Sequence, residues 1–176
     1  MALVIQLTYE PALDPFHAIF RFLRLRRLIA KDRPIHRDHA RILDFYQLFP
    51  YRVDAIRLKQ PDRRFRRLAS EFATRRPYGE QPDDRLLFNR MEPMQVAALD
   101  TLAANNLIDP ERWKVGEVLA TDQPVPPALA ARLEEANYSE HDLADFLHIL
   151  AVEYDLTGPN GLKARTGLME HRQDAI

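Results

Sequence analysis

The sequence contains no cysteine, which excludes disulfide bonds, zinc–thiolate sites and cysteine catalysis. Glycine is also scarce, with 5 residues against 13 prolines, so we expect proline to end most helices and strands. No apolar run reaches the roughly 18 residues of a membrane span. The start, MALVIQLTYEPALDPFH, has neither a basic segment nor a small-residue cleavage site. We therefore expect a cytoplasmic protein without a signal peptide or a membrane-spanning segment.

Charge is unevenly distributed along a chain of ordinary composition, 46% hydrophobic and 29% charged. Residues 1–78 hold 17 Lys and Arg against 8 Asp and Glu, whereas residues 79–176 hold 8 against 18. We predict one compact domain over residues 1–176, with a basic helical half at about 1–78 and an acidic half at about 79–176. Either one half binds an anionic partner or the two halves attract each other.

Apolar periodicity predicts a mainly α fold with a small β element. The expected helices cover residues 15–30, 36–49, 61–76, 93–104, 126–136 and 140–154, with a further short helix from Pro50. A short strand is expected near residues 113–121. The helix ending in NNLID and leading into this strand also suggests a winged-helix-like module in the second half.

The first predicted helix, residues 15–30, is apolar over most of its circumference. Asp14 is a suitable N-cap, and Pro15 suits the first helical position. A helix of this kind must be covered on several sides. The cover comes either from the rest of this chain or from a partner protein. The partner hypothesis makes Phe16, Phe20, Phe22 and Leu25 candidate interface residues.

No catalytic signature is present. The GPNGLKART segment lacks the spacing of a phosphate-binding loop, and neither GxSxG nor HExxH occurs. His36 and His39 are three residues apart but stand in a polar helix start, so we expect solvated histidines rather than metal ligands. His17 stands one turn from Arg21, which disfavours its charged form. We expect no enzymatic activity, no cofactor and no metal.

The strongest charge feature is the segment RRFRRLASEFATRR, residues 63–76. Its arginines are Arg63, Arg64, Arg66, Arg67, Arg75 and Arg76. They are candidate contacts for DNA phosphates or for an acidic protein partner, and the acidic half of the chain is the alternative partner. Phe65 and Phe72 belong to the predicted buried face, so base stacking is not indicated.

Four stretches carry a resemblance to a known family: YEPALDPFHAIFRFLRL, RILDFYQLFPYRVDAIRL, PYGEQPDDRLLFNRMEPMQVAALDTLAANNLID and GLKARTGL. In these stretches the sequence resembles the middle components of bacterial ABC-three-component systems. The resemblance covers residues 7–168 and rests on apolar and proline positions rather than catalytic residues. It implies an adaptor in a hetero-complex with an SMC- or Rad50-like ABC ATPase and a third, effector component. It also implies a role in defence against phages or plasmids.

On this resemblance, the corner around Pro50 adds Tyr46 and Phe49 to the candidate partner interface. A different class of function stays open at this stage. The arginine segment and the predicted winged-helix-like stretch are also typical of a free-standing DNA-binding or regulatory protein.

Overall fold

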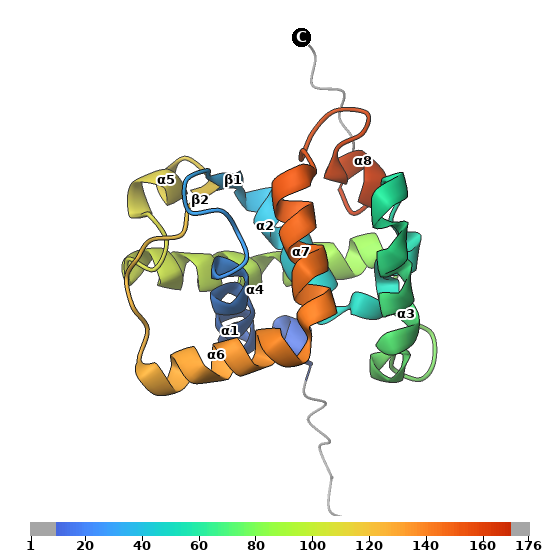
Figure 1. Ribbon diagram of the computed structural model, residues 1–176, viewed down its shortest axis with the longest axis horizontal. Coiled ribbons are helices and arrows are strands. Elements are labelled where there is room, and N and C mark those ends of the chain that lie inside the picture. The colour runs from blue at the N-terminus through green and yellow to red at the C-terminus, as the bar shows by residue number, and fades with distance from the viewer. Residues whose placement is uncertain (1–9, 170–176) are drawn as a thin grey trace, which may run out of the picture.

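Helices dominate the part of the chain that the computed structural model in Figure 1 describes, residues 10–169. In chain order, with η for a 3₁₀ helix, the elements are η1 (Pro11–Leu13), α1 (Pro15–Arg26), β1 (Ile35–His36), α2 (Arg37–Leu48), η2 (Pro50–Ala55), η3 (Gln60–Arg67), α3 (Leu68–Glu71), η4 (Ala73–Arg75), α4 (Asp84–Ala104), α5 (Pro110–Lys114), β2 (Glu117–Val118), α6 (Pro127–Ser139), α7 (His141–Glu153) and α8 (Leu162–Thr166). The mainly α fold with a small β element is confirmed.

Capping and proline chemistry set the first helices. Asp14 accepts hydrogen bonds from the backbone N–H groups of Phe16 (2.8 Å) and His17 (3.1 Å), as its position predicts. His36 caps α2 in the same way, because its Nδ1 accepts from the N–H of Asp38 at 3.0 Å. Pro50 ends α2 and begins η2, so the predicted short helix is a 3₁₀ helix.

The helix predicted over residues 61–76 is divided into η3, α3 and η4. Asp62, Phe65 and Leu68 are buried, and the residues between them are exposed. This three-residue spacing matches a 3₁₀ helix, which has 3.0 residues per turn. The sequence predicts an α-helix here with Phe65 and Phe72 on its buried face, and that prediction did not include Asp62.

The start of helix α4 also differs from the predicted boundary. The sequence suggests a start at Pro93, but α4 begins at Asp84, where Asp83 accepts from the N–H of Arg85 at 2.7 Å. Pro93 therefore lies inside the helix, on its exposed face. There the backbone carbonyl that proline leaves without a partner can bind water.

The only sheet within residues 10–169 joins the two halves of the chain. Strand β1 pairs antiparallel with β2, with Ile35 opposite Val118 and His36 opposite Glu117. The region near residues 113–121 does contain a strand, as predicted, but its partner comes from the first half. A separate winged-helix-like module in the second half is therefore not confirmed.

The predicted helices near residues 126–136 and 140–154 correspond to α6 and α7. Ser139 is the last residue of α6. Its Oγ donates to the carbonyl of Ala136 at 3.2 Å, and Glu140 occupies the N-cap position of α7 without a side-chain capping bond.

One hydrophobic core takes residues from both halves. In Figure 1, α7 lies in front of α2 and α4 crosses behind, while α6 runs below α1. Helix α2 is buried from Asp38 to Gln47 without interruption. Helix α1 packs on α2, α4 and α6, so its own chain supplies most of its cover. Among the described residues, no helix is long and apolar enough to cross a membrane.

Ion pairs join the basic half to the acidic half. They are Arg24–Glu140 (2.8 Å), Arg27–Glu134 (3.9 Å), Lys31–Asp122 (2.7 Å), Arg41–Glu92 (3.4 Å), Arg67–Asp142 (2.7 Å), Arg52–Asp84 and Arg75–Glu140. Attraction between the halves therefore accounts for part of the charge asymmetry seen in the sequence.

Candidate functional site

Helix η3 presents arginines along two of its three edges. Residues three apart are eclipsed in a 3₁₀ helix and are separated by about 6 Å along its axis. Arg63 and Arg66 therefore share one edge, and Arg64 and Arg67 share the next. All four side chains are exposed. In Figure 1 the η3–α3 column forms one side of the molecule, beside α8.

The third edge of η3 is fixed to the core. The hydroxyl of buried Tyr154 donates to Asp62 Oδ2 at 2.8 Å and accepts from the N–H of Lys59 at 2.9 Å. Burial raises the pKa of Tyr154 to about 12, and the carboxylate of Asp62 acts in the same direction. The ring of Phe65 packs on that of Phe146, with centroids 5.3 Å apart. These contacts hold η3 in one orientation.

The six candidate arginines fall into two groups. Arg67 pairs with Asp142 at 2.7 Å and with Glu71 at 3.4 Å, and Arg75 pairs with Glu140. The other four form no ion pair within residues 10–169: Arg63, Arg64, Arg66 and Arg76, which we term the unpaired arginines. The guanidinium of Arg64 lies over the ring of Phe65, 4.7 Å from its centroid.

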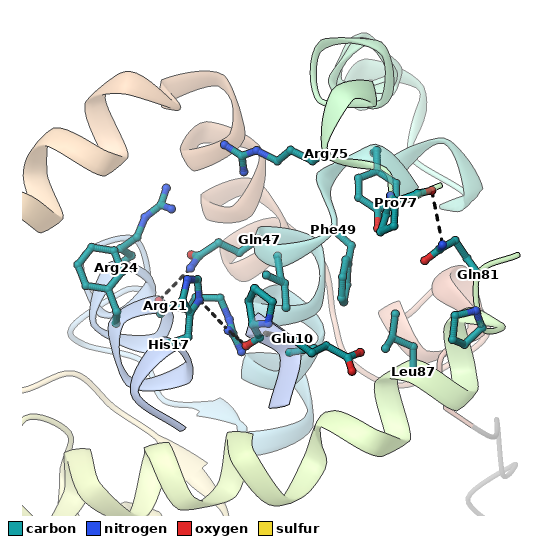
Figure 2. Close-up of a pocket in the computed structure, with 16 residues that line it drawn as sticks. Glu10, His17, Arg21, Arg24, Gln47, Phe49, Arg75, Pro77, Gln81 and Leu87 are labelled. Atoms are coloured by element: carbon teal, nitrogen blue, oxygen red, sulfur yellow. Dashed lines mark hydrogen bonds between the residues drawn. The ribbon is translucent and has the colours of Figure 1, made fainter. Parts of the chain in front are cut away.

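A cavity of about 670 Å³ lies between α1, the end of α2 and the segment that leads into α4. Figure 2 shows α1 side chains on one side and the segment around Pro77 and Gln81 on the other. Its lining residues are Glu10, Pro11, Ala12, His17, Phe20, Arg21, Arg24, Gln47, Leu48, Phe49, Tyr51, Arg75, Pro77, Gln81, Pro82 and Leu87. This composition, mostly apolar with a few polar groups, is typical of a binding pocket.

The polar part of the cavity wall rests on a buried ion pair. Arg21 donates to both carboxylate oxygens of Asp44, from Nε at 2.6 Å and from Nη2 at 3.1 Å. Gln95 donates to Asp44 Oδ2 at 2.9 Å, so helices α1, α2 and α4 meet at this carboxylate. The His17 Nδ1 lies 3.3 Å from Nη1 of Arg21 and must accept, because a guanidinium only donates. Burial and the charge of Arg21 lower the pKa of His17, the direction that favours its neutral form.

Gln47 brings a polar group without a partner to this wall. Its side chain is 2% exposed, and its Nε2 donates to the carbonyl of Arg21 at 3.1 Å. Because the backbone carbonyl can only accept, the atom that donates to it is the amide nitrogen. The other polar atom of the Gln47 side chain is the amide oxygen, Oε1. This oxygen is buried and has no hydrogen-bond partner among residues 10–169.

Glu140 connects two arginines at the cavity. It accepts from Arg24 Nη2 at 2.8 Å and also from Arg75, so it ties α1 to η4 through the start of α7. Burial by itself would raise the pKa of Glu140. The hydrogen bonds from Arg75 and Arg24 outweigh that effect, and its pKa lies below the ordinary glutamate value.

The two histidines at the start of α2 differ from each other. His36 is exposed, as expected. His39 is 5% exposed, so the prediction of a solvated side chain is wrong for it. Its Nε2 lies 2.8 Å from the carbonyl of Leu150, and burial lowers its pKa. Residues 10–169 contain no cluster of three or more His, Cys, Asp or Glu side chains suited to a metal ion.

The candidate partner residues are divided by burial. Phe22, Leu25 and Tyr46 lie in the hydrophobic core and leave no side-chain surface for a partner, which corrects their inclusion in the predicted interface. Phe20 and Phe49 line the cavity. Phe16 is 81% exposed and stands one turn before Phe20 on the same face of α1. Phe16, Phe20 and Phe49 therefore form the accessible part of the set, which we term the aromatic rim.

Sequence reasoning missed the polar groups that build this region: Asp44, Gln47, Gln95 and Glu140. A signal was available in α2, where Asp38, Arg41, Asp44 and Gln47 recur every three residues. Polar residues at that spacing normally indicate a solvated face. Here the face is buried, because its partners come from α1, α4 and α8.

Comparison with known proteins places the chain in a family. A family model described as "MC5: ABC-three component (ABC-3C) system Middle Component 5" matches residues 7–174. Searches of curated proteins and of solved structures gave no match. The family match extends from the segment before η1 to beyond α8 and includes both the unpaired arginines and the cavity. The chain therefore belongs to the Middle Component 5 family of ABC-three component systems.

Proposed function

We propose that this chain is a non-catalytic adaptor of a cytoplasmic ABC-three-component complex. Its partners in this proposal are an SMC- or Rad50-like ABC ATPase and a third, effector component, and the complex acts against phages or plasmids. The observation that carries the proposal is the family match over residues 7–174, because a middle component is by name one part of a larger system.

The aromatic rim is the surface that best fits a protein partner. Aromatic residues beside a pocket are typical anchors of protein interfaces. Burying a solvent-exposed phenylalanine side chain against a partner stabilises a complex by up to about 1.5–3 kcal/mol. Phe16 has most of its surface available for such a contact. The cavity lined by the other two residues of the aromatic rim, Phe20 and Phe49, has room for a partner side chain.

Co-expression with the ATPase and the third component encoded beside this chain tests the proposal. We expect the chain to be retained with a tagged ATPase and to elute with it in size-exclusion chromatography. Phe16→Asp should weaken retention, since it places a charge on the rim. Val115→Asp is the matched control, because Val115 is also exposed (69%) but lies after α5, outside the aromatic rim.

A chain that elutes alone as a monomer, with the ATPase in separate fractions, would contradict the adaptor proposal. If the same monomer bound DNA, that result would support the alternative of a free-standing DNA-binding protein. For the defence role, a strain carrying all three genes should restrict phage plating or plasmid maintenance. Deleting the gene for this chain should abolish that restriction.

A further inference from the structure

We propose that the η3 surface of this chain is a binding site for the phosphate backbone of a nucleic acid. The site consists of Arg63, Arg64 and Arg66 on η3, with Arg76 after η4 as a further contributor. This inference goes beyond the adaptor role, because neither the family description nor the aromatic rim implies a nucleic-acid contact.

Within residues 10–169, some arginines of the segment are paired with carboxylates and others are not. The acidic half supplies carboxylates to Arg67 and Arg75 on the same column. No acidic group within residues 10–169 pairs with the unpaired arginines, although they lie in the same segment. Attraction between the two halves therefore explains part of the arginine segment and leaves four exposed cations for an external anion.

The contacts of η3 with the core give its arginines a fixed arrangement. The Tyr154–Asp62 bond and the Phe65–Phe146 contact fix the buried edge of η3, so its two outer edges have a defined direction. Arg63 and Arg66 then stand about 6 Å apart along one edge. A regular row of cations suits a chain that carries a charge at every repeat, as a nucleic-acid strand does.

The side chains of the η3 surface are of the type that suits a phosphate group. Every cation of the site is arginine, whose planar guanidinium can donate two parallel hydrogen bonds to a phosphate. The guanidinium of Arg64 already lies over the ring of Phe65, so less conformational freedom is lost on binding. Because the site contains guanidinium groups without an exposed aromatic ring on η3, we expect contacts to the backbone rather than stacking on bases.

An acidic protein segment fits this surface less well. Protein interfaces contain an apolar core surrounded by polar residues. On η3 the apolar residue, Phe65, is turned inward and 2% exposed, and Leu68 at the start of α3 is fully buried. The η3 surface is charged without such an apolar centre, whereas the aromatic rim beside α1 supplies one.

The test is fluorescence anisotropy with the full-length chain and labelled oligonucleotides of arbitrary sequence, as DNA duplex, single-stranded DNA and RNA. Salt is varied from about 50 to about 200 mM. Each phosphate contact contributes about 0.7–0.9 to the slope of log K against log salt. Removing two contacts with Arg63→Ala/Arg66→Ala should flatten the slope by about 1.4–1.8 and weaken binding on the order of 100-fold at the lowest salt.

Two double variants serve as controls with the same loss of charge. Arg67→Ala/Arg75→Ala removes two arginines of the same column that are already held by carboxylates, and it should change the slope much less. Arg90→Ala/Arg112→Ala removes exposed arginines elsewhere. Thermal melting of each variant shows that it is folded. The duplex, single-stranded and RNA probes identify which nucleic acid is preferred.

Three results would overturn the proposal. The first is no binding of any of the three probes at the lowest salt. The second is an equal loss in all three double variants, which would indicate a general effect of net charge. The third is tighter binding of labelled poly-glutamate than of the oligonucleotides, which would assign the surface to an acidic protein. None of these results bears on retention by the ATPase, which depends on Phe16 and not on η3.

Discussion

The buried pair Arg21–Asp44 gives the sharpest stability prediction. Asp44 has no exposed surface, and the Arg21 side chain is 3% exposed. Asp44→Asn keeps the size of the side chain but removes its charge, so it leaves a guanidinium buried without its counter-ion. Breaking a buried pair from one side costs about 3–5 kcal/mol.

That cost is a large fraction of the roughly 5–15 kcal/mol by which a typical domain is stable. For a chain of this length, 1 kcal/mol corresponds to about 2–4 °C in Tm, so Asp44→Asn should lower Tm by about 6–20 °C. Denaturant unfolding followed by circular dichroism measures the free energy, and a thermal melt gives Tm. Glu117→Gln is the control. It breaks an exposed pair with Arg112 (3.0 Å), which should contribute less than about 1 kcal/mol.

A loss of under about 1 kcal/mol in Asp44→Asn would refute the reasoning, because the pair would then behave like a solvated one. The double variant Arg21→Met/Asp44→Leu separates the two parts of the effect. If the loss comes from an uncompensated charge, this variant should be more stable than Asp44→Asn, since neither charge remains.

Three further predictions concern single groups. Because Arg75 and Arg24 lower the pKa of Glu140, this carboxylate should stabilise the fold above about pH 4.5, and that stabilisation should be lost as the pH falls. In an acid-unfolding experiment, Glu140→Gln should therefore lose less stability on acidification than the unchanged chain. Tyr154, with a pKa of about 12, should stabilise the fold fully below pH 10 and lose that effect as the pH rises toward 12; a missing late step in the ultraviolet titration of Tyr154→Phe would confirm the assignment. The lowered pKa of buried His39 should make the fold less stable as the pH falls below about 6.5, and urea unfolding of His39→Gln should show a flatter profile from pH 7 to 5.

The sequence predicted local structure well where a single residue determines it. Asp14 with Pro15, and Pro50 after Phe49, set helix boundaries that the structure confirms. Prediction failed where the outcome depends on distant partners. The spacing of Asp62, Phe65 and Leu68 indicates a 3₁₀ helix only once Asp62 is known to be buried against Tyr154, a residue from the other half.

Only part of the candidate site could be predicted, because the rest also depends on residues that are distant in the sequence. The arginine segment was found, because charge is visible in composition. Its division into paired and unpaired arginines was not, since it depends on where Asp142 and Glu140 lie in space. The apolar side chains of α1 and the Pro50 corner could not be separated into core and rim by periodicity. Phe16 and Phe22 look equivalent in the sequence, but Phe22 is buried in the core whereas Phe16 is 81% exposed.

The burial of α2 has a consequence for the order in which the chain acquires its structure during synthesis. His39 contacts the carbonyl of Leu150, and Asp38 lies 3.4 Å from Nζ of Lys163. Groups near the start of α2 therefore have partners that lie more than a hundred positions later in the chain. Strand β1 likewise has its partner at residues 117–118. Closing such long loops is slow compared with local helix formation. During synthesis, the basic half should therefore emerge from the ribosome before it can fold completely. It should gain its native packing only when α7 and α8 have also emerged.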